Sequence, residues 1–118
     1  MKKIVSLLLI LLLIGCSSGY KTISATEAHN MMESDDSIVL IDVRNLDEYT
    51  KEHIPGSKNI PLDNISSIDL DKETTIIVYC LSGVRSQKAS EELTSMGYSN
   101  VYNIDGGIIN WGYDLERE

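Results

Sequence analysis

One cysteine in this chain stands where a strand pattern gives way to a helical one. Residues 74–79 are rich in β-branched side chains and lead directly into Cys80, and a helical pattern begins at Ser86. Open α/β sheets bind their ligands at the carboxyl ends of the strands. We therefore expect Cys80 to lie in a ligand site, although a lone cysteine can instead serve as a small buried apolar residue.

The short loop after this cysteine predicts an anion site. Successive backbone N–H groups in a tight turn bind negative charge, and the helix that follows adds the positive end of its dipole. Gly83 allows the turn, because a Cβ there would clash, and Arg85 supplies a cation. These groups favour the thiolate of Cys80, so we predict an accessible nucleophile with a lowered pKa. The loop consists of Leu81, Ser82, Gly83, Val84 and Arg85, with Ser86 directly after it.

The N-terminal residues have the pattern of a bacterial export signal. Lys2 and Lys3 precede an apolar run over residues 4–14, which is too short for a membrane-spanning helix of about 20 residues. Residues 13–16, Leu-Ile-Gly-Cys, resemble the box at which bacterial lipoproteins are lipidated and cleaved. The resemblance implies a lipid on Cys16 and a mature protein anchored on the extracytoplasmic side of a bacterial membrane. An ordinary signal peptide or an uncleaved anchor is the alternative.

The expected organisation is a signal peptide over residues 1–15, a lipidated tether over 16–20 and one domain over 21–118. Cleavage would remove two lysines and no acidic residue, so the formal net charge at pH 7 would go from −8 to −10. A domain this acidic is a poor nucleic-acid binder. It also has no electrostatic attraction to anionic lipid, so the acyl chains must anchor it.

The two cysteines of the chain have separate predicted roles. With Cys16 lipidated, Cys80 has no partner for a structural disulfide, although the export signal predicts an oxidising compartment. The sequence has no Cys-x-x-Cys pair and no cluster of cysteine and histidine with metal spacing. We therefore predict no metal site.

The remaining elements predict an α/β domain with a mostly parallel five-stranded sheet and helices on both faces. The continuous apolar run at 38–41 is typical of a strand that is covered on both sides. Ser24 and Glu27 form a predicted capping box, and a second helix is predicted over 86–96 with Gly97 as its stop. The strands are expected near residues 21–23, 38–42, 58–60, 75–79 and 101–104.

Three other parts of the chain receive structural roles. His29 lies off the apolar stripe of the first predicted helix, so we place it in solvent. Trp111 is expected to pack on the edge of the sheet. Residues 62–72 carry scattered apolar side chains among acids and serines and predict a partly helical connection.

Three separated pieces of the sequence together resemble the rhodanese-like domain, over nearly all of residues 21–118. The first contains Asp-Val-Arg at 42–44, Glu-Tyr at 48–49, Glu-His-Ile-Pro-Gly-Ser at 52–57 and Asn-Ile-Pro at 59–61. The second is the loop at 79–86, and the third is Asp-Gly-Gly at 105–107 followed by Trp111. The combination in this order is far more specific than any one piece.

This resemblance implies a sulfurtransferase that needs no metal or organic cofactor. Cys80 would take a sulfane sulfur from a small sulfur-containing anion or a persulfide, hold it as a persulfide and pass it to cyanide or a thiol. The loop from Leu81 to Arg85 would be its anion-binding cradle. Asp42 and Arg44 would brace that loop by charge-assisted hydrogen bonds. His53 belongs to a turn motif and is interpreted as structural.

Two features of the loop separate the candidate chemistries. Phosphatases of related fold place five residues between the cysteine and the arginine, whereas four lie between Cys80 and Arg85 here. Many relatives carry a basic residue directly after the cysteine, whereas this chain has Leu81. Thiosulfate would therefore lose an attractive partner, and a neutral or protein-bound persulfide donor is equally open. A binding or regulatory module without turnover and a redox-sensing thiol remain as alternatives.

Overall fold

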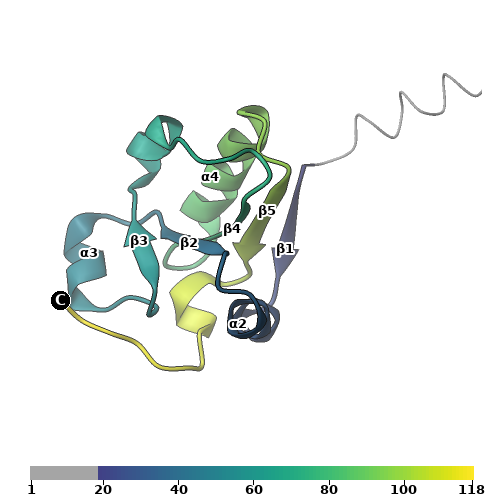
Figure 1. The fold of residues 1–118 in the computed structure, drawn as a ribbon. Helices are drawn as coiled ribbons and strands as arrows, with labels where there is room; N and C mark the ends of the chain where they lie inside the picture. The colour runs from purple at the N-terminus through teal and green to yellow at the C-terminus, as the bar shows by residue number, and fades with distance from the viewer. Residues whose placement is uncertain (1–18) are drawn as a thin grey trace, which may run out of the picture.

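A five-stranded sheet in the order β1-β5-β4-β2-β3 forms the centre of the molecule, and all pairings between its strands are parallel (Figure 1). The computed structural model describes residues 19–118. The predicted signal peptide, its cleavage site and Cys16 lie outside the described residues. The predicted α/β class and five-stranded sheet are confirmed, and the sheet is wholly rather than mostly parallel.

Helices and strands alternate along the chain, as the sequence predicts. The strands are β1 (Tyr20–Ile23), β2 (Val39–Asp42), β3 (Ser57–Asn59), β4 (Thr75–Tyr79) and β5 (Asn100–Ile104). The α-helices are α2 (Ala25–Ser34), α3 (Leu46–Lys51) and α4 (Val84–Ser95). Two short 3-10 helices complete the described part of the chain, η1 (Leu62–Ser67) and η2 (Gly107–Asn110).

The two faces of the sheet are covered by different elements, because successive side chains of a strand point to opposite faces. On one face, Ile76 and Val78 of β4 pack in a cluster with Ala89 and Leu93 of α4. On the other face, Ile77 of β4 packs in a cluster that includes residues of α2 and η2. Strand β4 is therefore buried from both sides, which explains its unbroken apolar run.

The ends of the helices follow the local signals in the sequence. The Glu27 N–H donates to Ser24 Oγ at 3.0 Å and the Ser24 N–H to Glu27 Oε1 at 3.4 Å, so the predicted capping box is confirmed. Gly97 has φ +103° just after α4, as its predicted stop requires. Helix α4 begins at Val84, two residues earlier than predicted, because Gly83 with φ +115° serves as its N-cap.

The C-terminal segment places His29 and Trp111 in surroundings that differ from the predicted ones. The ring of His29 is half-buried and stacks on Tyr113 with centroids 3.8 Å apart, so its predicted exposure to solvent is wrong. Trp111, expected at the sheet edge, is buried in the apolar cluster on the α2 face. A helical pattern cannot reveal either contact, because the covering residues come from the opposite end of the chain.

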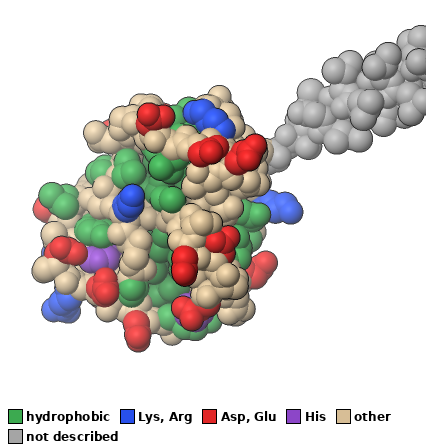
Figure 2. All heavy atoms as spheres, in the orientation of Figure 1, with side chains coloured by type: hydrophobic (Ala, Val, Ile, Leu, Met, Phe, Trp, Pro, Cys, Tyr) green, Lys and Arg blue, Asp and Glu red, His purple; other side chains and the backbone are tan. Residues whose placement is uncertain are grey.

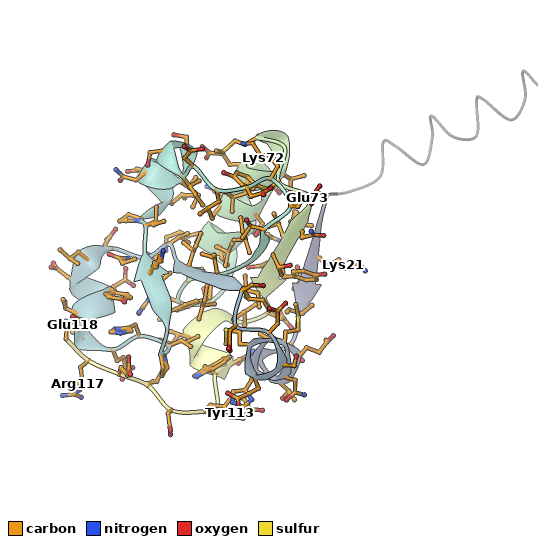
Figure 3. All side chains as sticks on the ribbon, in the orientation of Figure 1. Lys21, Lys72, Glu73, Tyr113, Arg117 and Glu118 are labelled. Atoms are coloured by element: carbon orange, nitrogen blue, oxygen red, sulfur yellow. The ribbon has the colours of Figure 1, made fainter. Side chains whose placement is uncertain are left out.

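The same segment then continues from α2 to α3, as the labelled Tyr113, Arg117 and Glu118 show in Figure 3. His53 and Glu116 exchange two backbone hydrogen bonds of 2.8 Å, and the Glu118 N–H donates to the Thr50 carbonyl at 3.0 Å.

Residues 62–67 form η1, so the predicted partly helical connection is confirmed. Among the helices of residues 19–118, none is long and apolar enough to cross a bilayer.

Candidate active site

Cys80 follows the last residue of β4 and is enclosed by the loop that leads into α4. The sequence predicts an accessible thiol, whereas the residue is only 1% exposed. The difference arises because the loop is held from behind: the Ile108 N–H donates to the Cys80 carbonyl at 2.9 Å and the Ile109 N–H to the Leu81 carbonyl at 3.3 Å. The loop therefore covers the thiol instead of presenting it at the surface.

Hydrogen-bond donors converge on the sulfur of Cys80. The Gly83 N–H donates to Sγ at 3.0 Å, and the hydroxyl of Ser86 lies 3.4 Å from Sγ. The same hydroxyl lies 3.2 Å from the Gly83 carbonyl, to which it donates. In the thiol form, Sγ–H donates to Ser86 Oγ. Loss of that proton leaves the hydroxyl free to turn and donate to the thiolate.

These donors favour the anion at Cys80. Burial by itself raises the pKa of the Cys80 thiol, but hydrogen bonds from the Ser86 side chain and from the backbone N–H groups of Ser86, Gly83 and Ser82 outweigh it. The net pKa lies below the ordinary value of a thiol. The predicted loop of backbone donors and the lowered pKa thus agree with the structure, and Ser86 is the side chain that contributes most to the lowering.

Arg85 does not offer a free cation to the loop. Its Nη1 and Nη2 donate to the two carboxylate oxygens of Glu48 at 2.8 and 3.1 Å, and both side chains are partly exposed. The hydrogen bond to Glu48 raises the pKa of Arg85, and the bond from Arg85 lowers the pKa of Glu48 despite some desolvation. The charge expected at the cradle is therefore neutralised by a residue of α3.

Asp42 and Arg44 form a buried ion pair beside this site. The Arg44 Nη2 donates to Asp42 Oδ2 at 2.7 Å and also to the Glu52 carbonyl at 2.7 Å. None of their hydrogen bonds within the described residues reaches the 81–85 loop, which differs from the predicted bracing. The pair instead fixes the end of α3, and α3 in turn supplies Glu48 to Arg85.

Glycine 107 supports the loop from behind, through a contact that the sequence does not reveal. Its φ is +59°, and a Cβ at Gly107 would clash with the carbonyl oxygens of Cys80 and Leu81. The backbone of η2 can therefore approach closely enough to make the hydrogen bonds from Ile108 and Ile109. This explains why the Asp-Gly-Gly turn accompanies the cysteine loop.

The contacts of His53 give it a structural setting. Its Nδ1 is 2.8 Å from the Tyr49 carbonyl, to which it donates, and its ring stacks on the Tyr49 ring with centroids 3.8 Å apart. Its Nε2 is 3.6 Å from carboxylate oxygens of Glu116 and Glu118. These contacts agree with the structural interpretation of His53 and place it between α3 and the C-terminal segment.

Glu48 is the site residue that sequence reasoning missed, although the segment containing it is part of the resemblance. It is 37 positions from Arg85 in the chain, and local spacing cannot pair two such residues. The signal that could have found it was the acidic residue within the first resembling piece, opposite a loop with an arginine.

Comparisons with known proteins agree with this fold and loop. The Rhodanese-like domain family matches residues 24–114. The thiosulfate sulfurtransferase GlpE of Coxiella burnetii is 36% identical over 94 residues, which cover 78% of this chain and 87% of that protein. The chain belongs to the rhodanese-like domain family.

Solved structures support the same assignment. The crystal structure of a rhodanese-like domain protein from Staphylococcus aureus matches with a TM-score of 0.75 and 32% identity, covering 83% of this chain and 98% of that one. A rhodanese with anions from E. coli matches with a TM-score of 0.62 and 35% identity, covering 69% of this chain and 99% of that one.

Replacement of Ser86 by alanine should raise the pKa of the Cys80 thiol, because the thiolate loses its side-chain donor. A hydrogen bond contributes about 1 kcal/mol, so alkylation by iodoacetamide at pH 7 should slow about fivefold. The pH dependence of the alkylation rate measures the effect. Ser95→Ala, an exposed change on the same helix, is the control. An unchanged midpoint in Ser86→Ala would contradict the assigned role.

Replacement of Asp42 by asparagine should lower the free energy of unfolding by about 3 kcal/mol, because it leaves the buried charge of Arg44 without its partner. Urea denaturation of the purified protein measures this change. Asp36→Asn, the same substitution at an exposed position, should change stability by no more than about 0.5 kcal/mol. Equal effects of the two substitutions would show that the pair does not hold the site together.

Proposed function

We propose that this protein is a sulfurtransferase that carries a sulfane sulfur as a persulfide on Cys80. The observation that carries the proposal is the setting of Sγ, which accepts from the Gly83 N–H at 3.0 Å and lies 3.4 Å from the Ser86 hydroxyl, since these groups lower the pKa of the thiol. The names of the relatives support it, since proteins that match most of this chain are called thiosulfate sulfurtransferases.

The proposed reaction has two displacements at sulfur. The Cys80 thiolate attacks the sulfane sulfur of a donor, a new S–S bond forms, and the donor's own S–S bond breaks. Its electron pair leaves on sulfite when the donor is thiosulfate, or on a thiolate when the donor is a persulfide. Cyanide or an acceptor thiolate then attacks the outer sulfur, and the Cys80 thiolate leaves. Neither step needs an external oxidant or reductant.

The same donors suit every stage of this cycle. The thiolate and the persulfide are both anionic at sulfur, and the loop places backbone N–H groups and the Ser86 hydroxyl around that charge. The burial of Cys80 also keeps water away from a bound persulfide. A module without turnover would have no use for this combination of donors.

Incubation with thiosulfate or a small persulfide should add about 32 Da to the protein of residues 17–118, which retains Cys80 as its single cysteine. Intact-mass spectrometry measures the adduct, and subsequent cyanide should remove it as thiocyanate. Cys80→Ser should show no adduct while its circular dichroism spectrum matches the wild type. A gain of about 16 Da with peroxide alone would favour the redox-sensing alternative, and an adduct on Cys80→Ser would contradict the nucleophile assignment.

We also propose that the protein is exported and anchored by a lipid on Cys16 at the extracytoplasmic side of a bacterial membrane. The supporting observations are the basic start, the short apolar run and the Leu-Ile-Gly-Cys box. One acyl chain binds a membrane only reversibly, so stable attachment needs the two chains of a diacylglyceryl group.

Cys16→Ala should move the protein from the membrane fraction into the soluble fraction of bacterial cells, because the variant has no site for the lipid. Fractionation by ultracentrifugation followed by immunoblotting measures this. A parallel Cys80→Ala variant should stay with the membranes. Retention of Cys16→Ala on the membrane would mean that the apolar run itself remains as the anchor.

A further inference from the structure

The described part of the chain exposes few large apolar side chains, and half of them adjoin the cysteine loop. Leu81 is 43% exposed, Val84 63% and Ile109 66%. We call these three residues the apolar rim. The other exposed members are Leu46, Tyr113 and Leu115.

Hydrogen bonds tie the apolar rim to the loop that holds the sulfur. Leu81 directly follows Cys80, and Val84 directly follows Gly83, whose N–H points at Sγ. The Ile109 N–H donates to the Leu81 carbonyl at 3.3 Å, which joins η2 to the loop. Exposed aliphatic side chains thus adjoin a reactive cysteine, where a partner that presents sulfur would have to approach.

The charges near the apolar rim do not favour a small dianion. Arg85 is engaged by both oxygens of Glu48, and Leu81 puts an aliphatic side chain where a cation would attract thiosulfate. Arg44 is buried in its pair with Asp42. On the face of the molecule drawn in Figure 2, acidic and basic side chains are interspersed. At the sulfur itself, the loop N–H groups are the donors that face the thiol, because Arg85 and Arg44 are each paired with a carboxylate.

A groove adjoins the apolar rim at Leu81. It has a volume of about 540 Å³. Besides Leu81, its lining consists of Arg44, Glu48, Thr50, Lys51 and Glu52, together with Arg117 and Glu118 of the C-terminal segment. Figure 3 shows the last two residues beside α3. The groove carries both signs of charge and has more volume than an inorganic donor fills, so it suits a polypeptide whose side chains are mixed.

We propose that the sulfur partner of Cys80 is a protein. Its cysteine is flanked by apolar residues that contact the apolar rim, and the neighbouring residues of its chain bind in the groove. This inference rests on the proposed sulfurtransferase function. The Cys80 thiolate attacks the outer sulfur of the partner's persulfide, so the Cys80–sulfur bond forms and the partner's S–S bond breaks. The electron pair stays on the partner's cysteine sulfur, which takes a proton from water.

The test compares persulfide donors on the full-length chain purified in detergent. The probes are a peptide persulfide with leucine on both sides of its cysteine, the same peptide with serine on both sides, and thiosulfate. Mass spectrometry at short times gives the rate of sulfur loading onto Cys80. The leucine peptide should load it about tenfold faster than the serine peptide, because the apolar rim buries its side chains.

Two variants assign this preference to the rim. Ile109→Ser should slow loading from the leucine peptide about fivefold, through the loss of buried apolar area, and leave loading from thiosulfate within about twofold. Leu115→Ser is the matched control on the C-terminal segment and should change neither rate. Leu81→Lys should speed loading from thiosulfate and slow loading from the leucine peptide.

The outcomes separate the two levels of the proposal. Equal rates for the two peptides, or no effect of Ile109→Ser, would overturn the protein partner and leave the sulfurtransferase function standing. Loading of Cys80 by none of the probes would overturn both. Binding of the Cys16→Ala chain to phosphatidylcholine vesicles that Ile109→Ser abolishes would assign the rim to lipid, which also overturns the protein partner.

Discussion

The hydrogen bond from the Gly83 N–H to the sulfur of Cys80, 3.0 Å long, is the contact on which the rest of the site depends. It exists because Cys80 directly follows the carboxyl end of β4, the central strand, and Gly83 adopts φ +115° before α4 begins. Desolvation alone would make the thiol harder to ionise, so a buried cysteine without these donors would be inert. With them, burial and a lowered pKa coexist.

Two neighbouring parts of the structure hold this loop in place. Directly behind it, η2 approaches closely at Gly107 and donates to the carbonyls of Cys80 and Leu81. To one side, the buried Asp42–Arg44 pair fixes the end of α3, and α3 presents Glu48 to Arg85. In this arrangement the loop N–H groups face the sulfur, both nearby arginines are paired with carboxylates, and exposed aliphatic side chains adjoin the loop. For these reasons we favour a protein partner over a free dianion.

The parts of this structure that depend on short stretches of sequence could be predicted. Apolar runs gave the strands, Ser24 and Glu27 gave a helix start, and the spacing from Cys80 to Ser86 gave the donor loop. Contacts between segments that are distant in the sequence could not be predicted in this way. The pairing of Arg85 with Glu48 and the burial of Cys80 both depend on how α3 and η2 pack, and no local pattern encodes that. The predicted exposure of His29 to solvent was wrong for the same reason, because the ring of Tyr113 stacks on it.

A titration of the backbone amides by nuclear magnetic resonance tests the central claim most directly. If the loop holds an anionic sulfur, the amide protons of Ser82, Gly83 and Ser86 should shift strongly with one midpoint, which coincides with ionisation of Cys80 and lies below the ordinary thiol range. The shifts should vanish in Cys80→Ser. Ionisation of Cys80 that leaves these three amides unmoved would contradict the account, because the thiolate would then be stabilised by something other than the loop.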